Sequence, residues 1–254
     1  MKGIVRVGTA GWSLPKRDQA VFPLGGSHLQ RYAARFAIAE VDTSFYRHHR
    51  RQTYARWAAE TPDWFSFAVK LPRTLTHEGA LACDNCEEID RFVNEIAGLG
   101  SRLKVVLVQL PPSLAFEQSS VRAFFEVLTQ RVAAETALVC EPRHESWHSA
   151  DADSLLIEFK IARVAVDPPR WQADAQPGGS RVISYFRWHG SPRIYYSNYS
   201  DEDIARFHAL ADLAASESEE VWCIFDNTAL GHATSDALKL VNNVAGDGPD
   251  LAPS

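Results

Sequence analysis

The sequence predicts a single (β/α)₈ barrel, in which a closed ring of parallel strands is surrounded by helices. Three observations predict this fold. Eight short strand-like runs follow one another along the 254 residues, helical patterns separate most of them, and nearly every run ends in a charged or amide side chain. In such barrels the strands provide a packed interior, and the residues at their carboxyl ends form the site.

The predicted strands are short apolar runs that are bounded by turn residues. They are rich in β-branched and aromatic residues, which pack well on a pleated surface. The eight runs cover residues 4–9, 38–43, 65–70, 104–109, 137–141, 162–167, 182–189 and 221–227. Cys140 and Cys223 lie inside apolar runs, so we expect them to be small core residues that face outward to the helices.

The predicted helices carry apolar residues at a spacing of three to four, which gives each of them one apolar face. They cover residues 28–36, 52–60, 87–99, 119–132, 151–160, 201–216 and 235–244. The sixth unit departs from this alternation, because the connection 168–181 is too short for a full helix and two loops. We therefore expect the sixth helix to be missing or reduced. Residues 1–244 should form one domain, and residues 245–254 a frayed tail.

The composition is typical of a globular protein, with 46% hydrophobic and 23% charged residues. A net charge of −6 and an isoelectric point of about 5.8 argue against general binding to nucleic acids or to anionic membranes. No apolar run reaches membrane-spanning length, and the first residues enter a strand without a signal-peptide core. Four cysteines fit a reducing compartment. A cytoplasmic location is therefore expected.

The segment from His144 to His148 formally matches H-E-x-x-H, the zinc-protease signature. That signature works on a helix, where two histidines four residues apart share one face and bind zinc. Here it follows a predicted strand by two residues, Pro142 stiffens the exit, and the next helix begins near Ser149 or Asp151. We therefore expect a loop, and no zinc bound jointly by the two histidines.

Other cofactor motifs are weak or absent. Cys83 and Cys86 form one C-x-x-C, which lacks the two further ligands of a zinc site, so a loop before a helix is favoured. The glycines at 177–180 lack the lysine of a phosphate-binding loop, and "GTAGW" is not a dinucleotide fingerprint. No G-x-S-x-G nucleophile turn occurs. No cofactor is predicted from these motifs, although a divalent metal stays an open alternative.

The polar strand ends form the candidate site. Five residues are candidate catalytic acids or bases, because carboxyl and imidazole groups transfer protons near neutral pH: Glu40, Glu141, Asp167, His189 and His77. Cations suited to carboxylate or phosphate, further polar groups and aromatic walls make up the candidate binding residues. These are Trp12, Asp42, Tyr46, Lys70, Gln109, Arg143, Trp147, Arg187, Tyr199, Asp226 and Asn227. Structural alternatives are internal ion pairs, such as Glu141 with Arg187, and packing of the aromatic rings in loops.

Seven segments, in order from about residue 4 to residue 240, carry a resemblance to a known family. They are "GTAGW", "EVDTSFYR", "FSFAVKLPRTLTH", "LVQLPPS", "EPRHESW", "YFRWHGSPRIYYSNY" and "FDNTALGHATSDAL". Together they resemble the DUF72 family, also called YecE-like proteins. The resemblance implies a TIM-type barrel and no established activity. Asn is more frequent in this family where the sequence has Asp42 and Asp226, so the charge of the site differs from the family pattern.

Three functions are compatible with these residues. The favoured one is an enzyme that uses acid–base chemistry on a small polar ligand, either anionic or sugar-like. The second is a barrel enzyme that depends on a divalent metal, with Glu40, Glu141, Asp167 and His189 as ligands. The third is a non-catalytic barrel that binds a ligand or a partner protein. The fold alone does not choose among them, because such barrels host many chemistries. The substrate, the reaction and the oligomeric state are left open.

Overall fold

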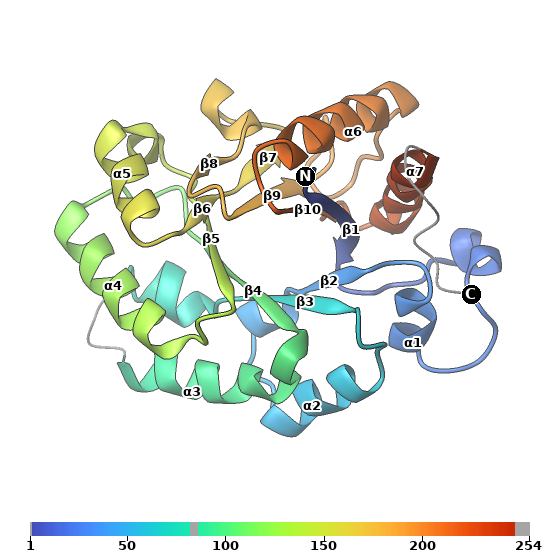
Figure 1. Cartoon of the computed structure of the whole chain (residues 1–254), viewed down its shortest axis with the longest axis horizontal. Coiled ribbons are helices and arrows are strands. Elements are labelled where there is room, and N and C mark those ends of the chain that lie inside the picture. The colour runs from blue at the N-terminus through green and yellow to red at the C-terminus, as the bar shows by residue number, and fades with distance from the viewer. Residues whose placement is uncertain (1, 82–85, 247–254) are drawn as a thin grey trace.

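The computed structural model describes residues 2–81 and 86–246 and has a mixed α/β fold around a nearly closed, barrel-shaped sheet (Figure 1). The predicted fold class is therefore confirmed. The sheet has ten strands in the order β7-β9-β10-β1-β2-β3-β4-β5-β6-β8. Their bounds are β1 Ile4–Ala10, β2 Ile38–Val41, β3 Ser66–Lys70, β4 Leu103–Gln109, β5 Ala137–Glu141, β6 Ala162–Arg163, β7 Ala165–Asp167, β8 Gly178–Gly179, β9 Ile183–Trp188 and β10 Glu220–Phe225.

The barrel is completed by the sixth predicted run, which the structure splits at Val164 into β6 and β7. β6 pairs with β5, and β7 pairs with β9, both in parallel. The first half of the run therefore pairs with β5 and the second half with β9, so the run does not pair with either neighbour along its whole length. β8 was not predicted; it pairs antiparallel with β6, at the two glycines of the connection that follows.

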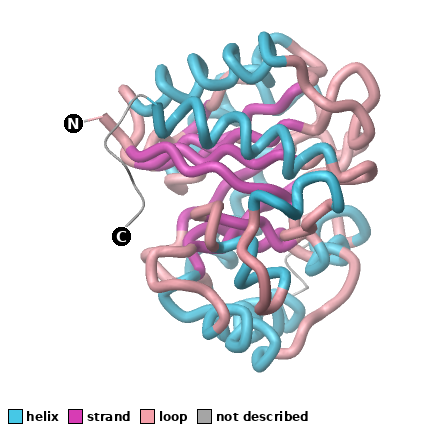
Figure 2. The backbone as a smooth tube through the Cα atoms, turned by 90° about the vertical axis from the view of Figure 1, so that its right-hand side faces the viewer, coloured by secondary structure: helices cyan, strands magenta, loops and turns pink. Residues whose placement is uncertain are grey.

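Seven α-helices in the described part of the chain cover the outside of the sheet, as Figures 1 and 2 show. They are α1 His28–Ala33, α2 Arg51–Ala59, α3 Cys86–Ile96, α4 Gln118–Arg131, α5 Ala150–Glu158, α6 Asp201–Ala215 and α7 His232–Gly246. All seven predicted helices are present. Residues 168–181 hold only a 3-10 turn at Gln172–Ala175 and β8, which confirms that the sixth helix is reduced.

Two buried apolar layers hold this arrangement together. The inner layer fills the barrel and includes Val105, Leu107, Tyr185 and Trp222. The larger outer layer lies between the strands and the helices, and each fully buried side chain contributes about 1.5–3 kcal/mol. Cys140 and Cys223 belong to the outer layer, which confirms that their side chains face the helices.

Two further predictions concern the ends of the chain and its cysteines. α7 continues to Gly246, so the predicted tail at 245–254 begins two residues too early; residues 247–254 lie outside the described residues. Cys83 of the C-x-x-C pair also lies outside them, so that motif is not tested. None of the helices within 2–81 and 86–246 is long and apolar enough to cross a membrane.

Candidate functional site

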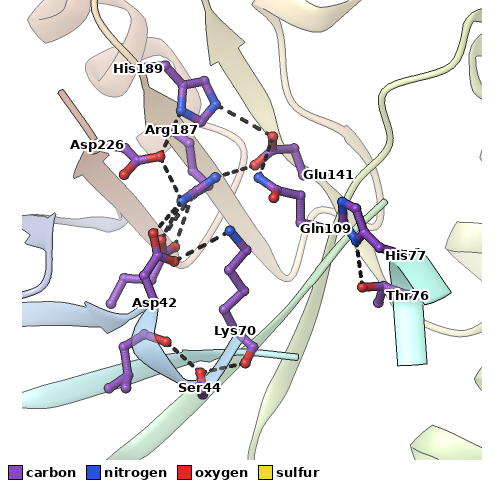
Figure 3. Close-up of polar contacts among 12 residues, drawn as sticks. Asp42, Ser44, Lys70, Thr76, His77, Gln109, Glu141, Arg187, His189 and Asp226 are labelled. Carbon is purple, nitrogen blue, oxygen red and sulfur yellow. Dashed lines mark hydrogen bonds and ion pairs between the residues drawn. The ribbon is translucent and has the colours of Figure 1, made fainter. Parts of the chain in front are cut away.

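The side chain of Arg187 lies at the centre of the polar strand ends and is fully buried (Figure 3). Its Nη2 donates to Glu40 Oε1 at 2.7 Å and to Asp226 Oδ2 at 3.0 Å, and its Nη1 donates to Glu141 Oε2 at 2.6 Å. Asp42 Oδ2 accepts from the same Nη2 at 3.4 Å. Arg187 reaches this position because alternate side chains of β9 point into the barrel. The guanidinium group of Arg187 therefore contacts four carboxyl groups. Glu40 and Glu141 lie on β2 and β5, and Asp42 and Asp226 directly follow β2 and β10.

Glu40 lies on the side of this cluster formed by β2, and no part of its side chain is exposed. Its Oε2 accepts a hydrogen bond of 2.7 Å from the hydroxyl group of Tyr185. Burial raises the pKa of Glu40 to about 8; Arg187 opposes this shift, whereas the neighbouring charges of Asp42 and Asp226 add to it.

Glu141 lies on the opposite side of Arg187 and is held by several donors. Gln109 Nε2 donates to its Oε1 at 3.0 Å, and Arg143 Nε donates to the same oxygen at 2.9 Å. Although burial disfavours the charge, Arg187 and Arg143 hold the pKa of Glu141 well below its usual range. Glu141 is therefore an ionised and structurally constrained carboxylate.

His189 lies between two carboxylates of the cluster. Its Nδ1 lies 2.9 Å from Asp226 Oδ2, and its Nε2 lies 3.5 Å from Glu141 Oε1. Burial disfavours a charged imidazole, but the hydrogen bond to Asp226 and the nearby carboxylate of Glu141 raise the pKa of His189 above its usual value. Burial likewise disfavours the charge of Asp226, yet Arg187 and His189 lower its pKa. Asp226 therefore remains a carboxylate.

A cavity of about 650 Å³ opens beside this cluster, between the ends of β1, β2 and β10. Its lining includes four aromatic rings, which belong to Trp12, Tyr46, Trp57 and Tyr195. It also includes the charged groups of Asp42, Arg47, Lys70 and Asp226, together with Ala10, Gly11, Ser13, His28, Val41, Thr43, His49 and Thr228. The cavity and the buried cluster thus share Asp42, Lys70 and Asp226.

Lys70 and Asp42 retain bonding capacity at the wall of this cavity. Lys70 Nζ lies 3.8 Å from Asp42 Oδ1 and 4.4 Å from the centre of the Phe45 ring. Asp42 Oδ1 is buried and has no hydrogen-bond partner among the described residues. A buried acceptor without a partner costs about 1–3 kcal/mol, so a ligand or a water that donates to it would be stabilising.

The structure brings most of the predicted site residues together. The cluster contains Glu40, Asp42, Lys70, Gln109, Glu141, Arg143, Arg187, His189 and Asp226, and the cavity adds Trp12 and Tyr46. His77 lies beside the cluster in a short π-helical turn, Thr74–Glu78, where its Nδ1 is 2.9 Å from Thr76 Oγ1 (Figure 3). Partial burial and the nearby charge of Lys70 lower the pKa of His77.

Four predicted residues are not brought to the cluster. Asp167 faces α6, where Arg206 Nη2 donates to it at 3.2 Å, and Asn227 Nδ2 donates to Asp236 on α7 at 2.7 Å. Both lie on the outward side of their strands. Trp147 and Tyr199 are fully buried, and their polar atoms bond to backbone oxygens of Leu114 and Asp167. None of these four residues lines the cavity of about 650 Å³.

Sequence reasoning left three residues out of the predicted site. Tyr185 could have been included, because it shares the inward face of β9 with Arg187. Tyr195 follows β9, where an aromatic wall of the site is expected, and it lines the cavity. Trp57 on α2 also lines the cavity, but its spacing in the sequence gives no signal for this. Tyr195 adopts a φ of 70°, which is uncommon for a residue other than glycine, and its ring contacts His189.

The histidines of the H-E-x-x-H segment have separate partners. His144 Nδ1 lies 2.9 Å from Ser146 Oγ, and His148 Nε2 lies 3.0 Å from Asp174 Oδ1. His144 precedes a 3-10 turn, Glu145–His148, in an extended conformation. The two residues therefore do not share a face of an α-helix.

The divalent-metal alternative gains no support from the geometry. Arg187 lies between Glu40 and Glu141, and Asp167 faces away from both. Within the described ranges, no group of three or more His, Cys, Asp or Glu residues is arranged to hold a metal ion.

Comparisons with known proteins agree with the barrel fold. The sequence profile described as "Protein of unknown function DUF72" matches residues 6–253. UPF0759 protein YunF of Bacillus subtilis is 22% identical over 280 residues, which cover 98% of each chain. UPF0759 protein YecE of Escherichia coli (strain K12) is 31% identical over 109 residues, which cover 42% of this chain and 38% of that protein.

Two solved structures have the same architecture. A DUF72 family protein of Thermotoga maritima has a TM-score of 0.76 and 25% identity, with 95% of this chain and 99% of that chain covered. A DUF72 family protein of Enterococcus faecalis has a TM-score of 0.80 and 21% identity, with 99% of each chain covered, and this likeness concerns the fold alone.

Proposed function

This chain belongs to the DUF72 family, a family of unknown function, and from its site we propose that the protein is an enzyme. Its proposed activity is general acid–base chemistry on a small hydroxylated ring compound, such as a sugar. The ligand would bind in the cavity beside β1, β2 and β10.

One observation carries this proposal. Asp42 and Asp226 both line one aromatic-walled cavity, and their Oδ2 atoms lie 3.4 and 3.0 Å from the same Arg187 Nη2. Two carboxyl groups held close together beside a ligand-sized cavity are a common arrangement for proton transfer.

Asp226, on one side of the site, and Glu40, next to Asp42 on the β2 side, have different electrostatic environments. Although burial disfavours its charge, Asp226 keeps a lowered pKa because of Arg187 and His189, so it suits the role of a base. On the β2 side, burial raises the pKa of Glu40 to about 8, so a proton is available there. Neighbouring carboxyl groups with pKa values pushed in opposite directions suit the complementary roles of acid and base.

The lining of the cavity favours a neutral hydroxylated ring over an anion. Aromatic side chains such as Trp12 and Tyr46 suit the apolar faces of a sugar ring, and Lys70 and Asp42 offer a donor and an acceptor to hydroxyl groups. Arg143 and Arg187, expected to bind an anion, already form ion pairs with Glu141. An anionic ligand would have to compete with these carboxylates.

The proposal is tested by a binding screen followed by a reaction assay. Neutral monosaccharides, sugar acids and sugar phosphates are compared by thermal shift, and the best binder is then incubated with the protein in deuterium oxide. We expect neutral sugars to give the largest shifts, and proton NMR to report a new sugar species or exchange of a carbon-bound proton. Asp226→Asn should abolish this reaction. Asp167→Asn is the matched control, because Asp167 also follows a strand but faces α6.

The proposal would be wrong if no hydroxylated ligand bound. It would also be wrong if binding and reaction were the same in the wild type, Asp226→Asn and Asp42→Asn. Shifts from sugar phosphates alone would instead support an anion site.

A further inference from the structure

The cavity of about 650 Å³ crosses the rim of the barrel at the end of β2. At its inner end, Asp42 and Asp226 approach Arg187 in the barrel interior, and Lys70 Nζ lies 3.8 Å from Asp42 Oδ1. Val41 also lines the cavity, but it belongs to the outer apolar layer. The cavity therefore continues from the polar strand ends to the side of the sheet that the helices cover.

Three rings, which we call the aromatic corner, line the outer end of the cavity: Trp12, His49 and Trp57. Trp57 lies on α2, and Trp12 contacts Phe67 of the outer apolar layer. The centre of the Trp57 ring lies 5.0 Å from that of Trp12 and 5.2 Å from that of His49, with interplanar angles of 75° and 69°. These edge-to-face contacts hold the three rings against one another.

The aromatic corner keeps apolar surface open to the cavity. Its three rings are half-buried, whereas three other tryptophans, Trp147, Trp188 and Trp222, are fully buried. Removal of apolar surface from water is favourable, so a ligand that covers these rings would be stabilised. The aromatic corner therefore suits the apolar face of a ligand ring, in addition to its packing against the core.

The two unlike ends of the cavity and its size indicate a ligand with two linked rings. Sites for drug-sized ligands have volumes of roughly 300–1,000 Å³, and the cavity of about 650 Å³ lies within this range. A monosaccharide is much smaller than such a ligand. We infer that the substrate is a carbohydrate of disaccharide size, with one ring at Asp42, Lys70 and Asp226 and the second ring in the aromatic corner.

This inference rests on the proposed function, because it takes the ring at the inner end to be hydroxylated. It adds the second ring and its binding residues. The end of β2 lies between the two ends of the cavity, so the bond that links the rings would lie beside Asp42.

The polar groups of the outer end favour an uncharged second ring. His49 Nε2 lies 2.8 Å from Thr43 Oγ1, a contact that orients the imidazole. Burial lowers the pKa of His49, and the nearby charge of Arg47 adds to this shift, which favours the uncharged imidazole. The exposed side chain of Arg47 also lines the cavity, and its donors can bond to hydroxyl oxygens.

Calorimetric titration of the full chain tests the inference. The probes are glucose, galactose and mannose, the disaccharides maltose, cellobiose and lactose, and glucose phosphate. We expect at least one disaccharide to bind about tenfold more tightly than the best monosaccharide, the scale that an added aromatic contact supplies. Trp57→Leu keeps an apolar side chain on α2 but removes the ring, so it should weaken binding of that disaccharide more than binding of the monosaccharide.

Trp64→Leu is the matched control, because Trp64 is an exposed tryptophan that does not line the cavity. It should leave the affinities for all probes unchanged. Should Trp57→Leu not fold, His49→Ala decides by the same comparison.

The outcomes separate this inference from the proposed function. If a monosaccharide binds and no disaccharide binds more tightly, the inference is wrong and the proposed function stands. The inference is also wrong if Trp57→Leu weakens both ligands equally, or if glucose phosphate binds more tightly than every disaccharide. If no neutral sugar binds, the inference and the proposed function are both wrong.

Discussion

Arg187 Nη2 on β9 lies 2.7 Å from Glu40 Oε1 on β2, although 147 residues separate the two in the chain. In the sheet, β10 and β1 lie between these strands. The ion pair therefore reaches across the interior of the barrel, and it fixes the position of the carboxyl groups that line the cavity. Removal of one partner would leave buried charges without compensation.

Arg187→Met is expected to lower the free energy of unfolding by about 3–5 kcal/mol, the usual cost of breaking a buried ion pair by removal of one partner. Arg187→Lys should recover only part of this loss, because an ammonium group cannot serve carboxylates on both edges of a guanidinium. Urea denaturation measures both effects. Arg206→Ala, which breaks a half-exposed pair with Asp167, is the control and should cost less than about 1 kcal/mol. Equal costs at the two positions would contradict the central role of Arg187.

Glu40 should make the folded protein less stable as the pH rises. Its folded pKa is raised from 4.5 to about 8, so between these values the folded state keeps a proton that the unfolded state has lost. The free energy of unfolding of the wild type, relative to Glu40→Gln, should fall by roughly 1.4 kcal/mol per pH unit in this window and level off above it. Denaturation curves recorded across the window measure the slope, and parallel curves for the two proteins would contradict the prediction.

Glu141 should contribute stability in the opposite direction. Although burial opposes the shift, Arg187 and Arg143 hold its folded pKa well below the ordinary value. Its contribution is therefore present above the ordinary carboxyl pKa and is lost as the pH falls through the folded pKa. Glu141→Gln should flatten the loss of stability in acid, whereas the exposed control Glu219→Gln should leave that loss unchanged. Acid unfolding followed by circular dichroism tests this, and an unchanged acid limb in Glu141→Gln would refute it.

Lys70 should matter for the ligand more than for the fold. Lys70→Met keeps the length and the apolar stem of the side chain but removes the donors at the cavity wall. We expect weaker binding of the best sugar by about 1.5–3 kcal/mol, the usual scale for a hydrogen bond to a charged group. Calorimetric titration measures the change, and Asp167→Asn again serves as the control. Unchanged affinity in Lys70→Met would remove Lys70 from the site.

His144 and His148 are not expected to bind zinc together. His148 is bonded to Asp174 in the segment that replaces the sixth helix, so His148→Ala should loosen that segment. Elemental analysis of zinc-loaded protein checks the metal. One zinc per chain that disappears in both His144→Ala and His148→Ala would contradict the prediction.

Much of the cluster could be predicted from the sequence, because strand parity is simple. Glu40 and Asp42 alternate with apolar neighbours, as Arg187 and His189 do, and the structure places all four in the cluster. The same parity would have excluded Asn227, which shares the outward side of β10 with Cys223, a residue of the outer apolar layer. Position at a strand end alone therefore does not place a side chain in the cluster.

Other differences between the predicted and the observed structure depend on which elements pack together in the folded chain. The local sequence does not specify these tertiary contacts. The split of the sixth strand depends on which neighbours its two halves meet, β5 and β9. Trp147 and Tyr199 look like cavity aromatics by position, but backbone oxygens accept from their polar atoms inside the core. Conversely, Trp57 lines the cavity although it lies on α2 and not at the end of a strand.

The central claim is that a hydroxylated ring binds against Asp42, Lys70 and Asp226. A crystal structure of the protein with the sugar that gives the largest thermal shift tests it most directly. We expect a ring in the cavity of about 650 Å³, with hydroxyl groups in hydrogen-bond contact with Asp42 Oδ1 and Lys70 Nζ and with an aromatic side chain against its face. A sugar bound outside this cavity, or bound inside it without contact to Asp42 or Asp226, would show that the proposed site is wrong.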